Sequence, residues 1–205
     1  MEMEIRKYWD GDFTMTDFSK SAKSVCKSPI FVLQQHNSLL PHFDLRLEIK
    51  SGILKSWTLP SNPFLEGSAK TDAVLVNDHY LPWAYFEGFI HEGKYGRGSV
   101  MIWDIGRLKI VEISERLKKD DEGYAVKGSS ILLEIEGVKV KGLFKLKYCN
   151  TINTFIYWSI QNSGNKIEYK IDKKILNVSA LSGHSIDYIG YQTQRKELSV
   201  PESTY

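Results

Sequence analysis

The stretch His42–Glu48 alternates strictly between polar and apolar side chains. Its polar positions are His42, Asp44, Arg46 and Glu48, and its apolar positions are Phe43, Leu45 and Leu47. A period of two residues is the pattern of a β-strand with two different faces. The stretch therefore predicts a strand that buries one face and presents polar groups on the other.

A second strand is predicted over residues 31–36, on the other side of the short loop 37–41. It places Gln34 and His36 on one face. If the two strands pair, their polar faces bring together two imidazoles, a carboxylate, a carboxamide and a guanidinium. This is a chemically specific combination.

Metal binding is one interpretation of that combination. His36, His42 and Asp44 form a metal-binding set with open coordination positions, and Arg46 on the same face is a fork-shaped anion clamp. The alternative is an ordinary solvated strand face with a cross-strand ion pair. Because His36 adds a second imidazole across a short loop, we weigh the two interpretations about equally from these residues alone.

The composition describes one globular domain, or one domain with a tail. The chain has 205 residues, 42% of them hydrophobic, and no apolar run approaches the roughly 20 residues needed to span a bilayer. The charged N-terminus predicts no secretory signal, and two cysteines without a framework fit a cytoplasmic location. A net charge of +2 is too small to indicate nucleic-acid binding by itself.

Further short strands, with almost no helix, are predicted along the chain. They cover residues 53–59, 73–76, 99–103, two paired strands within 131–148, and a hairpin formed by 154–160 and 166–171. Many short strands at regular spacing favour a mainly β fold, a closed or nearly closed β-barrel with a polar active-site mouth and few short helices. We expect an N-terminal arm over 1–30, the barrel domain over 31–160, and a C-terminal hairpin and tail over 161–205.

Two further features could contribute to a site. The strand 73–76 ends in the run Asn77-Asp78-His79. A polar residue at a strand end is well placed to join a site, although a histidine that stabilises a loop is the commoner case. The glycine-rich stretch 86–98 has neither the dinucleotide-binding nor the P-loop pattern. We therefore interpret its glycines as tight turns between strands.

Several short motifs follow one another along the chain. They are Gln34-x-His36, His42-Phe43-Asp44-Leu45-Arg46-Leu47-Glu48, Leu54-Lys55-Ser56-Trp57, Asp78-His79, the run from Phe86 to Gly98, and Ile102-Trp103-Asp104-x-Gly106. In this order they resemble the 3′-phosphoesterase domain of bacterial DNA ligase D and its stand-alone archaeal and bacterial relatives. The similarity is strong over residues 31–106 and weaker back to Asp12 and forward to about residue 160.

The resemblance implies a manganese-dependent enzyme that heals DNA 3′ ends in repair by non-homologous end joining. The mixed nitrogen and oxygen donors themselves suit Mn²⁺, with Co²⁺ as a substitute, and leave Fe²⁺ and Zn²⁺ as alternatives. Such an enzyme removes a terminal ribonucleoside to leave a 3′-phosphate, and then removes that phosphate. The implied partners are DNA or RNA-tipped DNA 3′ ends and a separate DNA ligase or polymerase, with no membrane. The implied metal ligands are His36, His42 and Asp44, the phosphate-binding residues are Arg46 and His79, and the further catalytic residues are Gln34 and Asp12.

The chain departs from the family pattern around this core. Where the family pattern has basic residues, this chain has Ser61, Thr71 and the pair Leu39-Leu40. Phe18 replaces an acidic residue of the arm, Asn77 replaces a glutamate, and Trp83 replaces a tyrosine. The changes remove charge from the periphery of the site. Differences from the family are therefore expected in substrate choice and in the monoester step.

Two other functions compete with this interpretation. A non-haem Fe(II) oxygenase would use His42, Asp44 and a later histidine, either His79 or His184, as a facial triad, but His36 would then have no role. The second rival is a catalytically impaired protein that only binds nucleic-acid ends. Oxygenation dependent on 2-oxoglutarate would establish the first rival, and tight end binding without turnover in Mn²⁺ would establish the second.

Overall fold

The computed structural model describes residues 29–65, 70–91, 94, 96–119, 124–164, 167–170 and 176–194. The strands are β1 (Ile30–Asn37), β2 (His42–Lys50), β3 (Ile53–Leu59), β4 (Thr71–Tyr80), β5 (Gly88–Ile90), β6 (Gly98–Ile113), β7 (Ser130–Gly137), β8 (Val140–Ile152), β9 (Phe155–Asn162) and β10 (Glu168–Tyr169). The helices are the 3₁₀ turn η1 (Leu81–Tyr85) and the short α3 (Glu115–Lys119) and α4 (Ile186–Gln194). The expected arm and its residue Asp12 lie outside the described residues.

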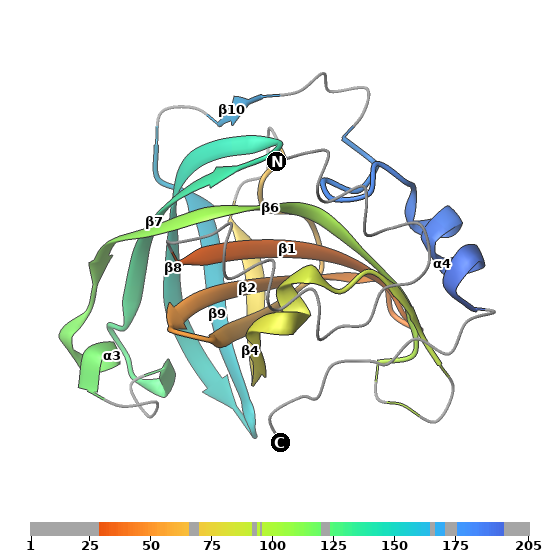
Figure 1. Cartoon of the computed structure of the whole chain (residues 1–205). Coiled ribbons are helices and arrows are strands. Elements are labelled where there is room, and N and C mark those ends of the chain that lie inside the picture. The colour runs from red at the N-terminus through yellow and green to blue at the C-terminus, as the bar shows by residue number, and fades with distance from the viewer. Residues whose placement is uncertain are drawn as a thin grey trace.

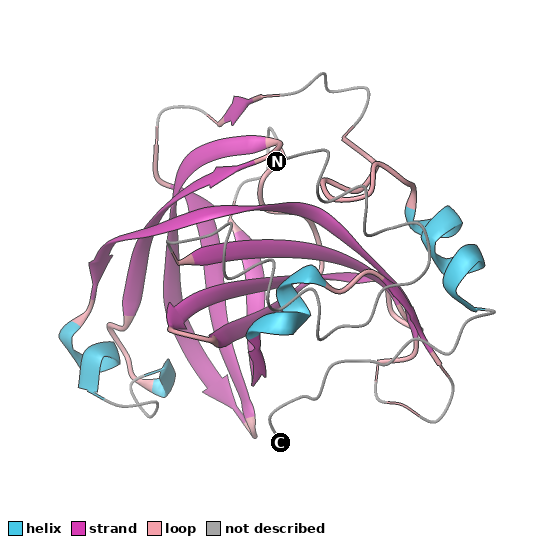
Figure 2. Ribbon diagram, viewed as in Figure 1, coloured by secondary structure: helices cyan, strands magenta, loops and turns pink. Residues whose placement is uncertain are grey.

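Eight antiparallel strands close into a barrel (Figure 1). Their order around the wall is β1-β2-β3-β4-β9-β8-β7-β6, and the pairing of β6 with β1 closes the ring. Strand β5 extends the sheet from β6, and β10 pairs with β8 outside the ring. The predicted mainly β barrel with few short helices is confirmed (Figure 2).

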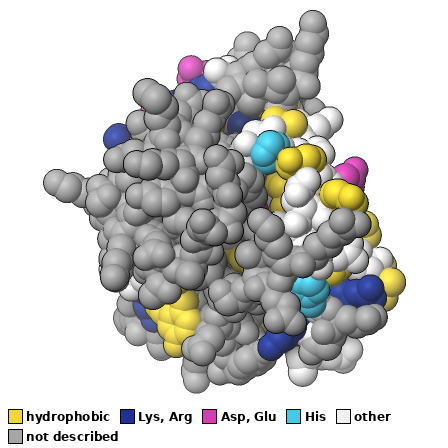
Figure 3. Space-filling model, turned by 45° about the vertical axis from the view of Figure 1, so that its right-hand side comes forward, with side chains coloured by type: hydrophobic (Ala, Val, Ile, Leu, Met, Phe, Trp, Pro, Cys, Tyr) yellow, Lys and Arg dark blue, Asp and Glu magenta, His cyan; other side chains and the backbone are white. Residues whose placement is uncertain are grey.

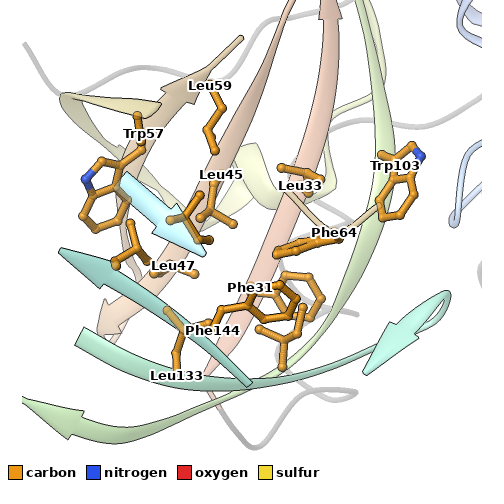
Figure 4. Close-up of a cluster of buried hydrophobic side chains, with 14 of the residues drawn as sticks. Phe31, Leu33, Leu45, Leu47, Trp57, Leu59, Phe64, Trp103, Leu133 and Phe144 are labelled. Carbon is orange, nitrogen blue, oxygen red and sulfur yellow. The ribbon is translucent and has the colours of Figure 1, made fainter. Parts of the chain in front are cut away.

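Apolar side chains from all eight strands of the ring fill the barrel interior. The strands alternate, so that Leu45 and Leu47 of β2 point inward beside Phe31 of β1 and Trp57 of β3 (Figure 4). Phe64, from the loop after β3, packs edge-on against Phe31 at 5.9 Å between ring centroids. Because alternation sends the neighbouring polar residues the other way, the polar face of β2 lies on the outside of the wall rather than in a barrel mouth.

A second, smaller layer covers that outer face. Trp83 and Ala84 of η1, with Phe86 and Ile90 around β5, pack on the outward residues of β1, β3 and β6, and Ala180 and Leu181 join them. The outer layer is tied to the barrel by a hydrogen bond from the Ala180 backbone N–H to the Ile102 carbonyl, 2.9 Å. The polar residues of β1 and β2 thus lie at the border between a barrel wall and its cover.

The prediction that residues 166–171 form a hairpin with residues 154–160 is wrong. Glu168 and Tyr169 form β10, which pairs with Lys141 and Val140 of β8 and not with β9. The reason is strand length, because β8 has 13 residues and β9 only 8, and the pairing with β9 begins at Phe144. The start of β8 is therefore open to a different strand.

The helix α4 was not predicted, although it packs against β5 and β6 beside the barrel (Figure 1). Its buried residues are Ile186, Ile189, Gly190 and Thr193. Gly190 allows a close approach, since a Cβ there would meet the Ser99 hydroxyl oxygen at 2.2 Å. Of the helices that the structure describes, none combines the length and apolarity that crossing a bilayer requires.

Candidate metal centre

The pairing of β1 with β2 brings the predicted ligands together. His36 lies directly opposite His42, and Gln34 lies opposite Asp44. The two imidazole rings are 4.7 Å apart between centroids, and one ligand atom from each of His36, His42 and Asp44 can be chosen so that all three lie within 4.8 Å of one another. The convergence expected from the alternating pattern is therefore present.

Backbone carbonyls orient both imidazoles. The Nε2 of His36 lies 2.7 Å from the Gly96 carbonyl oxygen, and the Nδ1 of His42 lies 2.7 Å from the Leu40 carbonyl oxygen. A carbonyl only accepts hydrogen bonds, so each of these nitrogens carries a hydrogen. The unprotonated nitrogens of the neutral rings are then Nδ1 of His36 and Nε2 of His42, which lie 3.7 and 3.8 Å from the two carboxylate oxygens of Asp44.

This donor set fits a divalent transition metal. Metal-binding histidines in proteins usually donate their second N–H to a carbonyl or carboxylate, which fixes the ring and the tautomer. Both histidines here have such a partner, and both lone pairs face one carboxylate. The side chains of His36 and Asp44 are 7% and 9% exposed, whereas that of His42 is 21% exposed, so the centre opens to solvent on the His42 side.

Asp44 stays ionised in this setting. Burial alone would raise the pKa of its carboxyl, but the positive charge of Arg46, together with interactions with His36 and His42, outweighs burial and holds the pKa well below its usual range. Thr58 of β3 also donates a hydrogen bond to the Asp44 carboxylate, 3.1 Å. A carboxylate kept anionic is the form that binds a cation.

Arg46 is almost completely engaged within the protein. Its guanidinium donates to Gln34 Oε1 (2.8 Å), Ser56 Oγ (3.1 Å), His79 Nδ1 (2.9 Å) and Asp44 Oδ2 (3.0 Å). Four of its five N–H groups thus have partners among the residues that the structure describes. Arg46 therefore cannot bind a phosphate through two N–H groups in this arrangement, as the fork-shaped clamp predicted. Only one N–H, on Nη2, is left for a substrate among these contacts.

His79 lies beside Arg46 and not among the metal donors. Its Nδ1 accepts from Arg46, and its ring meets the Trp83 indole edge-on at 5.4 Å. Burial, followed by the adjacent charge of Arg46, lowers the pKa of His79 to about 3. In this arrangement we therefore expect His79 to be a neutral imidazole near neutral pH. Its place beside Arg46 also removes it as the closing ligand of an oxygenase triad.

Gln34 acts behind the site. It is completely buried, and its amide donates to the carbonyls of Trp83 and Phe86, 2.9 Å each, while its oxygen accepts from Arg46. Gln34 thereby joins the covering layer to the guanidinium. The structure places it as a residue that orients Arg46, whereas the family resemblance implied an accessory catalytic contact.

The residues that depart from the family pattern lie in different settings. Trp83 is buried with its ring 5.6 Å from the Arg46 guanidinium carbon, which is a cation–π distance. Ser61 and Asn77 are exposed, and Thr71 is buried at the first position of β4, the end of that strand farthest from His79. His184, the other rival ligand, stacks on Tyr188 at 4.4 Å between centroids.

Sequence reasoning missed Ser56 and Thr58 as parts of the site. They are two polar residues of β3, and the strand register places Ser56 opposite Arg46 and Thr58 opposite Asp44. Ser56 Oγ also lies 3.2 Å from His79 Nδ1. The signal was the alternation of Ser56 and Thr58 with Trp57 and Leu59, but only the register shows which polar groups they meet.

Comparisons with known proteins agree on one family. Residues 34–147, more than half of the chain, match the family model described as DNA Ligase D 3′-phosphoesterase domain. The Multifunctional non-homologous end joining protein LigD of Pseudomonas aeruginosa is 39% identical over 102 residues, which cover 49% of this chain and 12% of that protein.

Two further relatives show the same partial coverage. The Multifunctional non-homologous end joining DNA repair protein LigD of Mycobacterium tuberculosis (strain H37Rv) is 34% identical over 116 residues, 57% of this chain and 14% of the relative. LigD of Mycolicibacterium smegmatis is 32% identical over 142 residues, 65% of this chain and 18% of the relative. The chain thus spans less than a fifth of the length of the curated relatives described here.

Proposed function

The chain belongs to the DNA ligase D 3′-phosphoesterase family, and on that premise we propose that it is a metal-dependent phosphoesterase acting on nucleic-acid 3′ ends during non-homologous end joining. The single observation that carries the proposal is the cluster of His36, His42 and Asp44, with both imidazole lone pairs facing the carboxylate. The cluster and its partners Gln34, Arg46, Ser56, Thr58 and His79 all lie inside the matched segment.

The metal ligands in this proposal are His36, His42 and Asp44, and the ion is Mn²⁺, with Co²⁺ as a substitute. Nitrogen and oxygen donors with open positions suit such ions. When bound, the ion supplies a Lewis acid beside a phosphoryl oxygen. The protein supplies oriented imidazoles and an anionic carboxylate, which are the donor forms that such an ion requires.

Arg46 and His79 would engage the substrate phosphate. Arg46 provides a buried positive charge and its remaining N–H, which stabilise charge that grows on a phosphoryl oxygen in the transition state. His79 acts as a neutral hydrogen-bond donor next to Arg46, and Ser56 together with Gln34 holds the pair in place. Asp12 stays a proposed catalytic residue of the N-terminal arm.

The proposed reactions are removal of a terminal 3′-ribonucleoside and, more slowly, removal of the resulting 3′-phosphate. A terminal phosphomonoester carries nearly two negative charges and a diester only one, so the monoester step needs more positive charge. Here the charge of Arg46 is already paired with Asp44 at 3.0 Å, and His79 is neutral. The diester step is therefore favoured, and a separate DNA ligase or polymerase would use the processed end.

Variants of the two groups of residues test the proposal. His42→Ala should abolish Mn²⁺ binding measured by calorimetry, because it removes a direct ligand. His79→Ala should retain Mn²⁺ binding and lose roughly 100-fold in turnover of a strand with one 3′-ribonucleotide, as expected for a lost transition-state partner. Full activity of His79→Ala would overturn its role. Tight binding of ends by the wild type, with no turnover in Mn²⁺, would establish the end-binding alternative instead.

A further inference from the structure

Two adjacent leucines project from the molecule beside the metal centre. Leu39 is 96% exposed and Leu40 is 78% exposed, more than any other large hydrophobic residue that the structure describes. Single exposed leucines are common, but a contiguous exposed apolar pair indicates a contact surface. Figure 3 shows that hydrophobic side chains are exposed on one face of the molecule.

The loop that carries the two leucines is anchored to a metal-site histidine. The Leu40 carbonyl accepts hydrogen bonds from Ser38 Oγ at 2.8 Å and from His42 Nδ1 at 2.7 Å. Ser38 Oγ also lies 3.3 Å from His42 Nδ1. These bonds fix the backbone of the loop, so the leucine side chains are held outward in a defined place relative to the metal centre.

The distance from the loop to the centre is short on the scale of a nucleic acid. Leu40 is two residues from His42, so their Cα atoms are at most about 7 Å apart, and Leu39 is at most about 10 Å from it. Duplex DNA advances about 3.4 Å per base pair. A strand whose phosphate reaches the metal centre and which runs along this loop would therefore bring its next two or three nucleotides within reach of the leucines.

We propose that Leu39 and Leu40 pack against the nucleobase next to the scissile phosphate and select ends whose terminal bases are unstacked. This inference rests on the proposed function. The loop 37–41 contains no charged residue, so it cannot hold a phosphate by charge, whereas apolar side chains including leucine insert between base steps in other nucleic-acid complexes. Every base has a flat face on which such side chains can pack.

The test compares Leu39→Ser/Leu40→Ser with the wild type on two strands. Both strands end in one 3′-ribonucleotide, and one lacks the bases on the two nucleotides that flank the terminal phosphodiester. Turnover in Mn²⁺ gives kcat and KM, and fluorescence anisotropy in EDTA gives Kd without turnover. The matched control is Ile152→Ser/Phe155→Ser, which removes an apolar pair that is 52% and 56% exposed from the tip of the β8–β9 hairpin, away from β1 and β2 in the ring.

The proposal predicts that the leucine variant raises KM and Kd about tenfold on the base-bearing strand, with kcat within twofold and no change on the abasic strand. The control variant and the conservative variant Leu39→Met/Leu40→Met should behave like the wild type. Unchanged Kd, or equal losses on both strands, would overturn the base contact. A dimer of the wild type that the serine variant dissolves would also overturn it, by showing a second copy on the leucines.

The two hypotheses fail in different ways in this design. Absence of cleavage by the wild type in Mn²⁺ would refute the proposed function, while the anisotropy measurement still decides the base contact. Cleavage by the wild type with a Kd indifferent to the leucines would refute only the base contact.

Discussion

Replacing Asp44 by Asn should separate two effects of this carboxylate. Asp44 balances the buried charge of Arg46 at 3.0 Å, with side chains 9% and 5% exposed. Removing one partner of a buried ion pair leaves the other charge uncompensated, which typically costs 3–5 kcal/mol of folding free energy. Because an amide oxygen can still accept one hydrogen bond from Arg46, we expect the lower end, about 3 kcal/mol.

The second effect concerns the metal. An ion that binds only the native state at 100 times its Kd raises the free energy of unfolding by about 2.7 kcal/mol. The wild type should show this gain, and Asp44→Asn should not. The difference in unfolding free energy between the two proteins should therefore grow from about 3 kcal/mol in EDTA to about 6 kcal/mol in saturating Mn²⁺.

Urea unfolding followed by tryptophan fluorescence, in EDTA and in Mn²⁺, measures all four free energies. The matched control is Glu134→Gln, which breaks a surface pair with Lys109. It should lose less than about 1 kcal/mol and keep the full response to Mn²⁺. The reasoning is refuted if Asp44→Asn responds to Mn²⁺ like the wild type, or if it loses less than 1 kcal/mol in EDTA.

Three further predictions follow from the packing and the charges. Gly137→Ala should destabilise by about 3 kcal/mol or more, because its Cβ would lie 2.1 Å from Asp104 Oδ2, whereas Gly164→Ala, whose nearest neighbours are at 3.5 Å, should change the unfolding free energy by less than about 1 kcal/mol. Burial raises the pKa of Glu87 from 4.5 to about 7. The folded protein therefore holds this proton more tightly than the unfolded chain, and the unfolding free energy should fall as the pH rises from 4.5 to 7. In urea titrations Glu87→Gln should flatten this dependence on pH, and an unchanged slope would exclude Glu87 as its source. The slope of log K against log salt for end binding should be shallow, about −2 to −4 at −0.7 to −0.9 per phosphate contact, and a slope near −8 would reveal a basic track that the described surface does not explain.

The sequence predicted the cluster because its signal is local. Alternation in β2 fixes which residues share a face, and a short loop leaves little freedom in how β1 pairs with it. His36 and His42 therefore meet in the structure as the pattern indicated. The closed barrel could be predicted from the number of short strands, because a sheet with open edges is unfavourable.

The charge state of the site could not be predicted in this way. Whether His79 is charged depends on burial and on the neighbouring Arg46, which a strand pattern does not reveal. The internal partners of Arg46 come from β1, β2, β3 and β4, and they decide how much of the guanidinium is left for a substrate. These are properties of tertiary packing and not of local sequence.

The C-terminal elements were missed for physical reasons as well. The buried face of α4 contains Gly190 and Thr193. Their spacing from Ile186 is helical, but because neither is a large apolar residue, the apolar pattern that predicts a helix is weak here. Lys139 is 1% exposed, with its ammonium bonded to the carbonyls of Leu176 and Val178. A lysine is expected at the surface, so this anchor of the segment before α4 could not be inferred from sequence.

The most direct test of the central claim is a time course with a 5′-labelled DNA strand that ends in one 3′-ribonucleotide, with Mn²⁺ or with EDTA. We expect removal of the ribonucleoside only with Mn²⁺, and accumulation of the 3′-phosphate end. A strand supplied with a 3′-phosphate should react at least about tenfold more slowly, a barrier difference of about 1.4 kcal/mol. An intact strand after incubation of the wild type with Mn²⁺, or equal cleavage by Asp44→Asn, would contradict the proposed metal-dependent phosphoesterase.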